Sequence, residues 1–321
     1  MTKPSITAAV LFPILLLAVA IGGLTLFRID STPPWRSTSS VSQTPDSLES
    51  SDFKISDGAK PFTFITYNVK NWLISNQSPP KKPEAKEAVI QILAEADPDV
   101  IGLSEIGSKE DVEEIRLLMA EAGHDLPHTY HTGGVDTVRH LAILSRFPIV
   151  STESPSLAIP GKGYSMQRGM LDVTIEVGTE KIRFIGLHLK SKRNTPEFNQ
   201  ALLRIDEAAH TRKHIDAILA SDPQAMVVCY GDFNDTTRSL STRAIFGTYR
   251  TPEYLSPIHV KDSRGESWTH CWAYQDIYSR IDFVTVSQPL KRRVDKNASR
   301  IIDDPEWETA SDHRPVLVRF K

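Results

Sequence analysis

Polar side chains that could bind a cation or move a proton stand at the ends of several hydrophobic, strand-like segments. Burying a polar group costs free energy unless a partner satisfies it. One such residue would be dismissed as a structural hydrogen bonder, whereas a set at the ends of different strands predicts one convergent pocket. In chain order the set is Asn68 in T-Y-N-V, Glu105 in L-S-E-I, His188 in G-L-H-L-K-S-K, Asp232 and Asn234 in G-D-F-N-D, Arg280 and Asp282 in R-I-D-F, and Asp312 and His313 in S-D-H-R-P-V.

Each of these motifs alone has an ordinary interpretation. Glu105 could be a surface acid, His188 a packed strand histidine, and G-D-F-N a turn, in which Gly, Asp and Asn are favoured. Asp282 is the hardest to explain in that way, because R-I-D-F-V places an acid inside an apolar, strand-like run. The ordered combination therefore favours an active site over unrelated structural residues.

Strands must position these groups, and the sequence predicts alternating strands and helices up to residue 123, then a strand-rich stretch. Apolar and β-branched runs predict strands, and helical periodicity with capping and stop signals predicts helices. We expect strands at 61–68, 99–104, 138–145, 148–158, 170–177, 181–188, 225–230, 281–286 and 315–320, and helices at 84–96, 108–123 and 196–220.

Residues 60–321 are long enough for one large α/β domain. Consecutive strands between 126 and 188 are awkward for a purely parallel sheet, so we expect a mixed or antiparallel two-sheet core with helices outside. His210 and His214 lie four residues apart in the helix at 196–220, and we interpret them as part of a solvated face rather than a metal pair. The face predicted to point inward comprises Leu202, Ile205, Ala209, Ile215 and Leu219.

The first sixty residues are predicted to lie outside that domain. Residues 4–27 contain no charged side chain, and a helix of that length spans about 36 Å, enough to cross a bilayer. Residues 1–28 are therefore predicted to be an uncleaved signal anchor or a signal peptide cleaved near Ala20. Residues 29–59 are rich in Ser, Thr and Pro and predict a flexible linker. We expect a single-pass membrane protein with an extracytoplasmic domain, or a secreted or periplasmic one.

Composition excludes several classes of protein. With 40% hydrophobic and 24% charged residues, the chain is neither globally disordered nor a coiled coil. The net charge of −3 excludes a strongly basic nucleic-acid coat. Two cysteines cannot build a disulfide scaffold. Cys229 fits a small core hydrophobe, although a bridge to Cys271 is conceivable in an exported protein.

The motifs G-D-F-N, R-I-D and S-D-H, in that order, resemble those of the endonuclease/exonuclease/phosphatase superfamily. These metal-dependent phosphoesterases include pancreatic-type DNases, abasic-site endonucleases, inositol polyphosphate phosphatases and sphingomyelinases. The resemblance covers residues 62–320, and H-L-A-I-L-S-R-F-P-I is similar to a strand pair of that family. It implies an α/β fold, a four-layer α-β-β-α sandwich with two mixed, largely antiparallel sheets and the site at one edge.

Phosphoester hydrolysis sets the chemistry that such a site must supply. The phosphate's negative charge repels hydroxide, so catalysis is mainly electrostatic and positional, and a hard divalent cation with oxygen ligands suits it. The resemblance implies that Glu105 is the principal Mg²⁺ ligand, with Mn²⁺ as an alternative ion. Asn68 would lie beside Glu105, and Asp312 would support this metal or a second cation.

The resemblance also implies the catalytic roles. Asp232 would orient and deprotonate the attacking water and be held by Asn234. His313 would hydrogen-bond to the phosphoryl oxygens as an imidazolium paired with Asp282, because a neighbouring carboxylate raises a histidine pKa. His188 would be a second donor facing the phosphate.

The substrate is less constrained than the chemistry. Arg280, Tyr130 and Lys190 are candidate phosphate contacts, and Arg280 could also pair with an acid of the site. The K-S-K-R segment after His188 adds local positive charge. We expect a phosphodiesterase or nuclease, with an inositol-phosphate or phospholipid-head phosphatase and an inactive binding module as alternatives. Residues 4–27 would contact a membrane, no protein partner can be inferred, and no long aromatic insertion indicates a lipid-docking hairpin.

Overall fold

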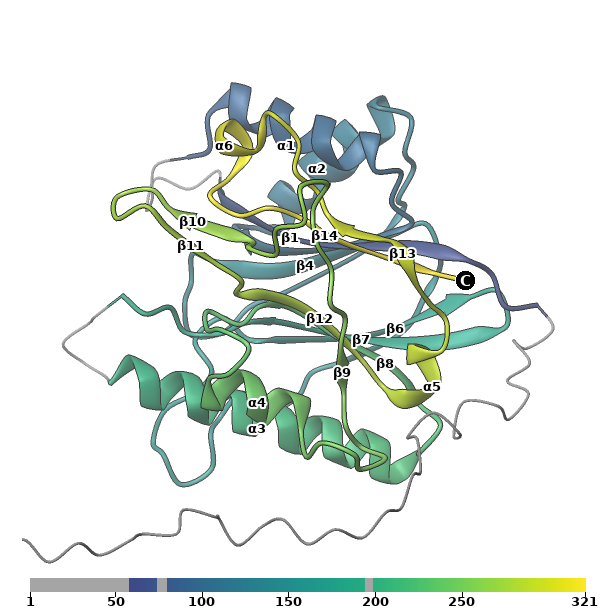
Figure 1. Ribbon diagram of the computed structural model, residues 1–321, viewed down its shortest axis with the longest axis vertical. Helices are drawn as coiled ribbons and strands as arrows, with labels where there is room; N and C mark the ends of the chain where they lie inside the picture. Colours follow the sequence, from purple (N-terminus) through teal and green to yellow (C-terminus); the bar gives the residue numbers. More distant parts are fainter. Residues whose placement is uncertain (1–57, 74–79, 194–198) are drawn as a thin grey trace, which may run out of the picture. The chain divides into compact units, whose positions relative to one another are not determined.

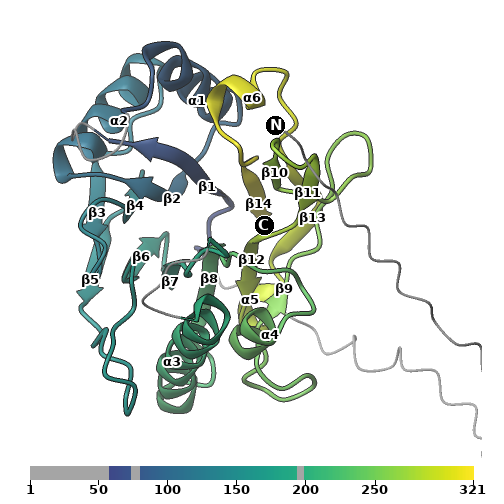
Figure 2. The same ribbon diagram turned by 90° about the vertical axis from the view of Figure 1, so that its left-hand side faces the viewer.

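Two six-stranded sheets pack face to face, with helices on both outer faces (Figure 1). The computed structural model of the protein describes residues 58–73, 80–193 and 199–321. Figure 2 separates the sheets, with β1, β2 and β4 in one and β6, β7 and β8 in the other. The expected four-layer α/β sandwich is therefore confirmed.

The first sheet has the strand order β13-β14-β1-β2-β4-β3. Its strands are β1 (Phe62–Trp72), β2 (Val100–Ile106), β3 (His128–Thr132), β4 (His140–Ser145), β13 (Val294–Ile301) and β14 (Val316–Phe320). Its outer face is covered by α1 (Pro83–Glu95), α2 (Lys109–Glu121) and the short α6 (Trp307–Ala310). Only β1 and β2 pair in parallel among these described strands.

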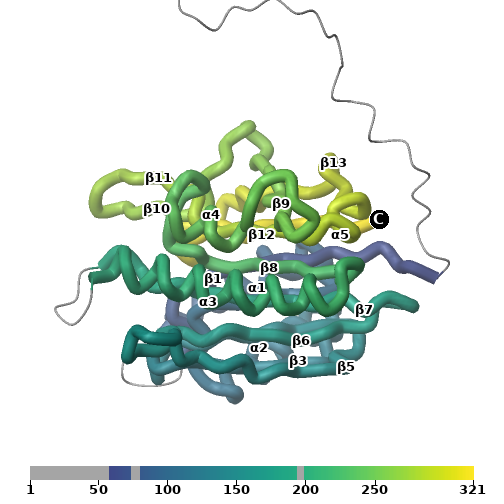
Figure 3. The backbone as a smooth tube through the Cα atoms, turned by 90° about the horizontal axis from the view of Figure 1, so that it is seen from below, coloured from purple at the N-terminus to yellow at the C-terminus, as the bar shows by residue number. Residues whose placement is uncertain are grey.

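The second sheet has the strand order β5-β6-β7-β8-β12-β9. Its strands are β5 (Ile149–Glu153), β6 (Met170–Val177), β7 (Glu180–His188), β8 (Met226–Asp232), β9 (Ser256–Pro257) and β12 (Asp282–Val286). Helices α3 (Gln200–Ser221) and α4 (Leu240–Phe246) lie over its outer face (Figure 3). A separate hairpin of β10 (His270–Trp272) and β11 (Ile277–Ser279) and the short α5 (Gln288–Lys291) complete the described elements.

Three buried apolar clusters hold the four layers together. The cluster between the sheets includes Phe64, whose ring lies 5.2 Å from that of Phe184 and 4.8 Å from that of Tyr230. The other two lie beneath α1 and α2 and beneath α3 and α4. Cys229 belongs to the last of these, and both it and Cys271 are free thiols, so the conceivable bridge is not formed.

The structure contains elements that the sequence did not predict. Strand β13 reads V-D-K-N-A-S-R-I, which has no alternating apolar pattern, and its pairing with β14 shifts register. Strand β3 and helix α4 were also missed, and the strand expected at 148–158 ends at Glu153. Short or polar elements depend on neighbours for their stability, so their own sequence signal is weak.

The predicted inward face of α3 was wrong in its first half. Leu202 is 57% exposed and Ala209 is exposed, whereas Leu203 is buried. Polar residues occupy the buried face, because Glu207 accepts backbone N–H groups from Gln167 and Lys190. The spacing of apolar residues cannot predict a buried acid whose carboxylate accepts hydrogen bonds from the backbone of another segment.

The two histidines of α3 bind protein groups instead of forming a metal pair. His214 Nε2 lies 2.7 Å from Asp172 Oδ2 on β6, and His210 Nε2 lies 2.6 Å from the carbonyl oxygen of Ser156. The metal-pair reading is therefore not supported. The solvated-face interpretation holds in part, since both side chains are half-buried.

The predicted signal or anchor at 1–28 and most of the linker at 29–59 lie outside the described residues. Among the helices that are described, none is both long and apolar enough to span a bilayer. Export and tethering therefore stay predictions.

Candidate active site

The ends of five strands meet at one edge of the sandwich. Parallel pairing of β1 and β2 places Asn68 beside the residue that precedes Glu105. Parallel pairing of β7 and β8 places His188 opposite Asp232, and antiparallel β12 places Asp282 opposite Asp232 from the other side. Register within each sheet and the packing of the two sheets together thus gather groups separated by up to 214 positions in the chain.

Asp232 is the centre of this cluster and is 2% exposed. Its Oδ2 atom accepts hydrogen bonds from Asn68 Nδ2 and Asn234 Nδ2, both at 3.1 Å, and its Oδ1 accepts the Asn234 N–H at 2.8 Å. Imidazole nitrogens lie farther away, with His188 Nε2 at 3.5 Å and His313 Nε2 at 3.8 Å from Oδ2. The carboxylate is thus oriented by amides and faced by two imidazoles.

The backbone around the cluster is held in unusual conformations. Four of the seven non-glycine residues with positive φ in the described chain lie here: Lys70, Asn71, Glu105 and Asn234. Glu105 has φ +66°, and such conformations cost about 1–3 kcal/mol each and persist only where the surroundings impose them. Gly231 of G-D-F-N has φ +124°, and a Cβ there would collide with the Leu187 carbonyl oxygen.

Glu105 reaches the same cluster from the end of β2. One carboxylate oxygen accepts the Asn71 N–H at 3.0 Å, and the other lies 3.4 Å from Asn68 Nδ2. Arg139 Nε lies 3.7 Å and His188 Nε2 4.0 Å from its oxygens. Its side chain is 18% exposed, so it can meet a ligand that enters from solvent.

His313 and Asp282 form a buried pair on the other side of Asp232. His313 Nδ1 lies 2.9 Å from Asp282 Oδ2. Burial alone would lower the His313 pKa, but Asp282, its hydrogen bond, Asp232 and Asp312 raise the pKa to about 10. His313 is therefore an imidazolium at neutral pH, with Nε2 directed toward Asp232.

The two other ionisable groups of the cluster are shifted by burial. Burial and the charge of Asp282 raise the pKa of Asp232. Burial, then the positive charges of Arg168, His313 and neighbouring cations, lower the pKa of His188 well below its usual value. Opposite shifts of neighbouring groups are typical of catalytic sites, since each proton is then available where the reaction needs it.

The sequence matches the Endonuclease/Exonuclease/phosphatase family over residues 65–313. This match spans most of the chain and both sheets. The chain belongs to the endonuclease/exonuclease/phosphatase family. It is accordingly a phosphoester hydrolase, as the resemblance predicted.

Solved structures of the endonuclease/exonuclease/phosphatase fold agree with this assignment. Truncated TDP2 from Caenorhabditis elegans superposes with a TM-score of 0.58 at 17% identity, covering 81% of this chain and 97% of the other. Sphingomyelinase C from Streptomyces griseocarneus gives 0.58 at 19%, covering 82% and 100%. A family protein from Bacteroides thetaiotaomicron gives 0.56 at 18%, covering 82% and 97%. No curated protein matches by sequence.

Enzymes of this family generally depend on divalent metals, and the donor set here fits such an ion. Glu105 offers carboxylate oxygen atoms, which hard cations prefer. The Asn68 amide oxygen accepts the Lys70 N–H at 3.0 Å, and its amide nitrogen faces Glu105. Asn71 Oδ1 is buried next to them and has no hydrogen-bond partner within the described part of the chain. Asp232, Asp282 and His313 also have ligand atoms within 4.8 Å of one another. That trio suits a cation less well, because protonated His313 is itself a donor to Asp282.

Asp312 and Lys190 lie at the margin of the family's site. Asp312 Oδ2 is 3.3 Å from Lys70 Nζ, and its carboxylate is 34% exposed. Lys190 is half-buried, and its backbone N–H donates to Glu207. Burial and the charge of Arg168 lower the Lys190 pKa. The predicted contact of Asp312 with a cation and that of Lys190 with a phosphate therefore stay predictions.

Arg280 and Tyr130 have other partners than those expected. Arg280 donates to the carbonyl oxygens of Ile258 at 2.7 Å and Val260 at 3.4 Å, so the predicted pairing with an acid of the site is not seen. Tyr130 packs against the core between the sheets. Both side chains contact the protein interior. The order of the motifs in the sequence does not reveal this.

Several residues of the site carried no signal in the sequence. Arg139 faces Glu105, and buried Arg168 donates to the Leu189 carbonyl at 2.9 Å and lies 3.6 Å from Asp136. Arg139 directly precedes β4, inside the strand expected at 138–145, and Arg168 precedes β6. An isolated arginine before a strand is too common a feature to have identified them.

The carbonyl of Gly107 is clamped by two histidines, His131 and His140. His131 Nε2 lies 3.1 Å from this oxygen, and His140 Nδ1 also bonds to it. Gly107 follows Glu105 by two residues, so the clamp fixes the turn that presents the Glu105 carboxylate.

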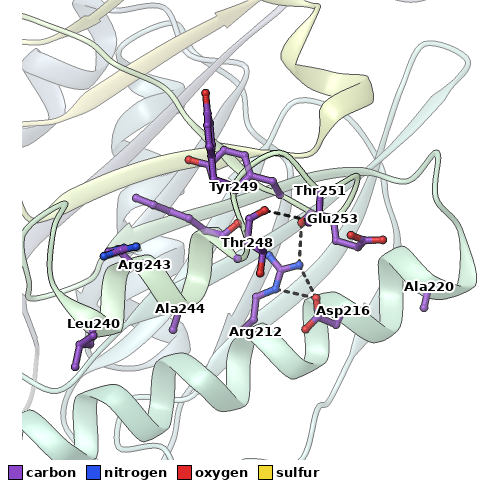
Figure 4. A pocket seen from close by; sticks show the side chains of 13 residues that line it. Arg212, Asp216, Ala220, Leu240, Arg243, Ala244, Thr248, Tyr249, Thr251 and Glu253 are labelled. Atoms are coloured by element: carbon purple, nitrogen blue, oxygen red, sulfur yellow. Dashed lines mark hydrogen bonds and ion pairs between the residues drawn. The ribbon is translucent and has the colours of Figure 1, made fainter. Parts of the chain in front are cut away.

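A separate surface pocket lies between α3, α4 and the loop that follows (Figure 4). Arg212 crosses it and donates to Asp216 at 2.8 Å and to the carbonyls of Ile245 and Phe246. These bonds satisfy the guanidinium within the protein. None of the predicted site residues lines this pocket.

Proposed function

We propose that the protein is a Mg²⁺-dependent phosphodiesterase. The observation that supports this most is the buried Asp232 facing the His313–Asp282 pair, with Glu105 and Asn68 on the adjoining sheet. A binding module would not need a buried imidazolium aimed at a second carboxylate, because that arrangement costs desolvation free energy.

Asp232 accepts a proton from the attacking water in this proposal. The amide groups of Asn68 and Asn234 fix its orientation, and its raised pKa makes it a stronger base than an exposed aspartate. A positioned base of this kind contributes about 10²- to 10⁴-fold to the rate.

The positively charged His313 donates from Nε2 to the phosphoryl oxygens, and Asp282 holds its ring from the other nitrogen. His188 provides a neutral donor beside it. Both groups are buried and already oriented, so little reorganisation accompanies the charge that develops in the transition state.

Glu105 and Asn68 would hold Mg²⁺, or Mn²⁺ in its place, and Asp312 is a candidate for supporting a second cation. When bound, the cation would neutralise phosphoryl charge. Added EDTA should therefore abolish turnover, and excess Mg²⁺ should restore it. Turnover unchanged by EDTA would contradict the proposal.

The charges around the pocket favour a diester with an anionic extension. Arg139, Arg168 and Lys190 all lie near His188 and lower its pKa. Lys192 continues this positive side, although its Nζ pairs with Asp235 at 3.0 Å. A nucleic acid fits these cations, but the net charge of −3 predicts weak, salt-dependent affinity.

A phospholipid or inositol-phosphate head group is the second candidate substrate. Two observations favour it: the fold similarity to sphingomyelinase C, and the exposed Trp272 and Tyr274 that follow His270, whose ring lies 4.6 Å from that of His313. In this reading residues 4–27 would hold the enzyme at a membrane, with the catalytic domain outside the cytoplasm.

A substrate panel tests the proposal directly. Purified protein with Mg²⁺ or Mn²⁺ is offered bis-p-nitrophenyl phosphate, p-nitrophenyl phosphate, plasmid DNA, RNA, sphingomyelin and inositol phosphates. We expect diester hydrolysis that Asp232→Asn removes. Turnover of monoester alone would overturn the diesterase assignment, and no turnover at all would favour the binding module. Extraction of membranes with alkaline carbonate tests the tether, since an anchored chain stays in the pellet.

A further inference from the structure

The hairpin β10–β11 exposes an unusual concentration of large apolar side chains. Trp272 is 48% exposed, Tyr274 87%, Ile277 43% and Tyr278 50%, all within seven residues. The hairpin projects from the sheets beside α6 and β14 (Figure 1). Single exposed apolar residues are ordinary, whereas a contiguous exposed group marks an interaction surface. The sequence had indicated no docking hairpin, so this feature emerged only from the fold.

The hairpin that carries the exposed group adjoins His313. Pairing places His270 opposite Ser279 and Trp272 opposite Ile277, so His270, Trp272 and Ile277 share one face of the hairpin. The His270 ring lies 4.6 Å from the His313 ring, and the two residues form a backbone bridge. A surface that Trp272 and Ile277 contact therefore lies a short distance from the reacting centre.

Tyr278 lies on the opposite face of the hairpin, where it is 50% exposed but also packs against a second layer of rings. Tyr278 lies edge-on to Trp268 at 4.8 Å, and Trp268 lies edge-on to Trp307 at 5.0 Å. The Arg314 guanidinium covers the Trp268 ring at 3.3 Å and pairs with Asp262 at 2.8 Å. The Cys271 N–H also donates to the Asp312 carbonyl. The exposed side chains thus stand on a supported base rather than on a frayed loop.

Charge identifies the kind of surface that fits. Residues 270–279 contain no lysine or arginine and one acid, Asp276. Binding to a nucleic-acid strand combines aromatic stacking with cations along the backbone. Trp and Tyr mixed with an aliphatic side chain instead match the interface of a bilayer, where their amphipathic rings lie among head groups.

We propose that hairpin β10–β11 docks the enzyme on a zwitterionic phospholipid surface, with Trp272, Tyr274 and Ile277 inserted among the head groups. Docking would bring phosphoesters at that surface to the His313 side of the pocket. The inference extends the lipid reading of the proposed function, but binding itself needs no turnover. Failure of the assay and failure of docking are therefore separate results.

Fluorescence quenching by brominated phosphatidylcholine vesicles tests docking in the full-length chain. The difference between wild type and Trp272→Phe isolates the signal of Trp272, whatever the rest of the chain does. We expect quenching of this signal by brominated lipid. Trp307→Phe is the matched control and should leave the quenched component unchanged. Quenching identical in wild type and Trp272→Phe would overturn the proposal.

A second variant separates docking from catalysis. Tyr274→Ser/Ile277→Ser should lose quenching of Trp272 and cleave vesicle-borne substrate about tenfold more slowly, corresponding to about 1.4 kcal/mol. Its turnover of a soluble diester should be unchanged. The control Leu240→Ser/Tyr249→Ser alters an exposed aliphatic and an exposed tyrosine on the α4 side and should behave as wild type. Quenching of Trp272 by a single-stranded oligonucleotide, but not by lipid, would assign the hairpin to nucleic acid instead.

Discussion

Two buried aspartates of the second sheet, Asp232 on β8 and Asp172 on β6, have opposite environments. Asp172 is 0% exposed and accepts two hydrogen bonds from Arg183, at 2.7 and 2.6 Å, and one contact from His214 at 2.7 Å. Although burial alone would raise the pKa of Asp172, these partners lower it. Asp232 is equally buried but has amides as its nearest partners, and its pKa is raised.

The difference shows how a fold distinguishes a structural acid from a reactive one. Arg183 and His214 compensate the negative charge of Asp172 fully. Asp172 is therefore stable as a carboxylate and needs no further partner. The negative charge of Asp232 is compensated incompletely. Binding of a proton, a water or a substrate therefore stabilises it. A site of this kind costs stability, which the remaining fold must offset.

Replacement of Asp232 should give the largest loss of activity with no loss of stability. Asp232→Asn keeps the shape but removes the base, so we expect kcat to fall about 10³-fold. Because the variant also removes a poorly compensated buried charge, its melting temperature should equal or exceed that of wild type. Steady-state kinetics and a thermal melt on the same sample check both parts, and retained kcat would break the comparison.

His313→Gln should give the next largest effect. It removes the imidazolium donor but retains a hydrogen-bonding side chain, and we expect kcat to fall about 10²-fold. Asp282→Asn should act in the same direction, since the ring then loses its charged partner. A normal rate for both variants would show that the pair is structural, as Asp172 and Arg183 are.

Asp172→Asn should lower stability and leave activity nearly unchanged, the opposite of Asp232→Asn. Loss of this carboxylate leaves Arg183 and His214 without their partner, but both are partly exposed, so solvent reduces the cost to about 2 kcal/mol. The melting temperature should fall by about 5 °C while kcat changes less than about twofold. A large loss of kcat without a lower melting temperature would contradict the structural role.

The smallest expected effect is on the pH dependence of stability, compared between wild type and Asp172→Asn. The lowered pKa of Asp172 means that its contribution to stability is fully present above its unfolded pKa, about 3.9, and is lost as pH falls through the lower folded value. Wild type should therefore lose stability more steeply than Asp172→Asn below about pH 4. Parallel urea melts across pH 3–6 measure this difference, and identical slopes would refute it.

Sequence patterns predicted the long, strongly apolar elements well. The strands around Asn68, Glu105, His188 and Asp232 and the helices at α1, α2 and α3 lie close to their expected ranges. Strand β13 and the hairpin β10–β11 were missed because their residues are polar or few, and pairing with neighbours stabilises them. The face of α3 was misjudged because Glu207 is buried to serve another segment's backbone.

The sequence by itself determined which chemical groups are present, their order and their positions at strand ends, because local hydrophobic patterns define where a strand stops. Tertiary structure alone decided their distances and charge states, since those depend on sheet register and on the packing of two sheets, which joins residues as far apart as Asn68 and Asp232. It also decided that Arg139 and Arg168 join the site, that Arg280 does not pair with its acids, and that an aromatic hairpin adjoins His313. These outcomes follow from packing, in which each side chain's environment is built from distant segments.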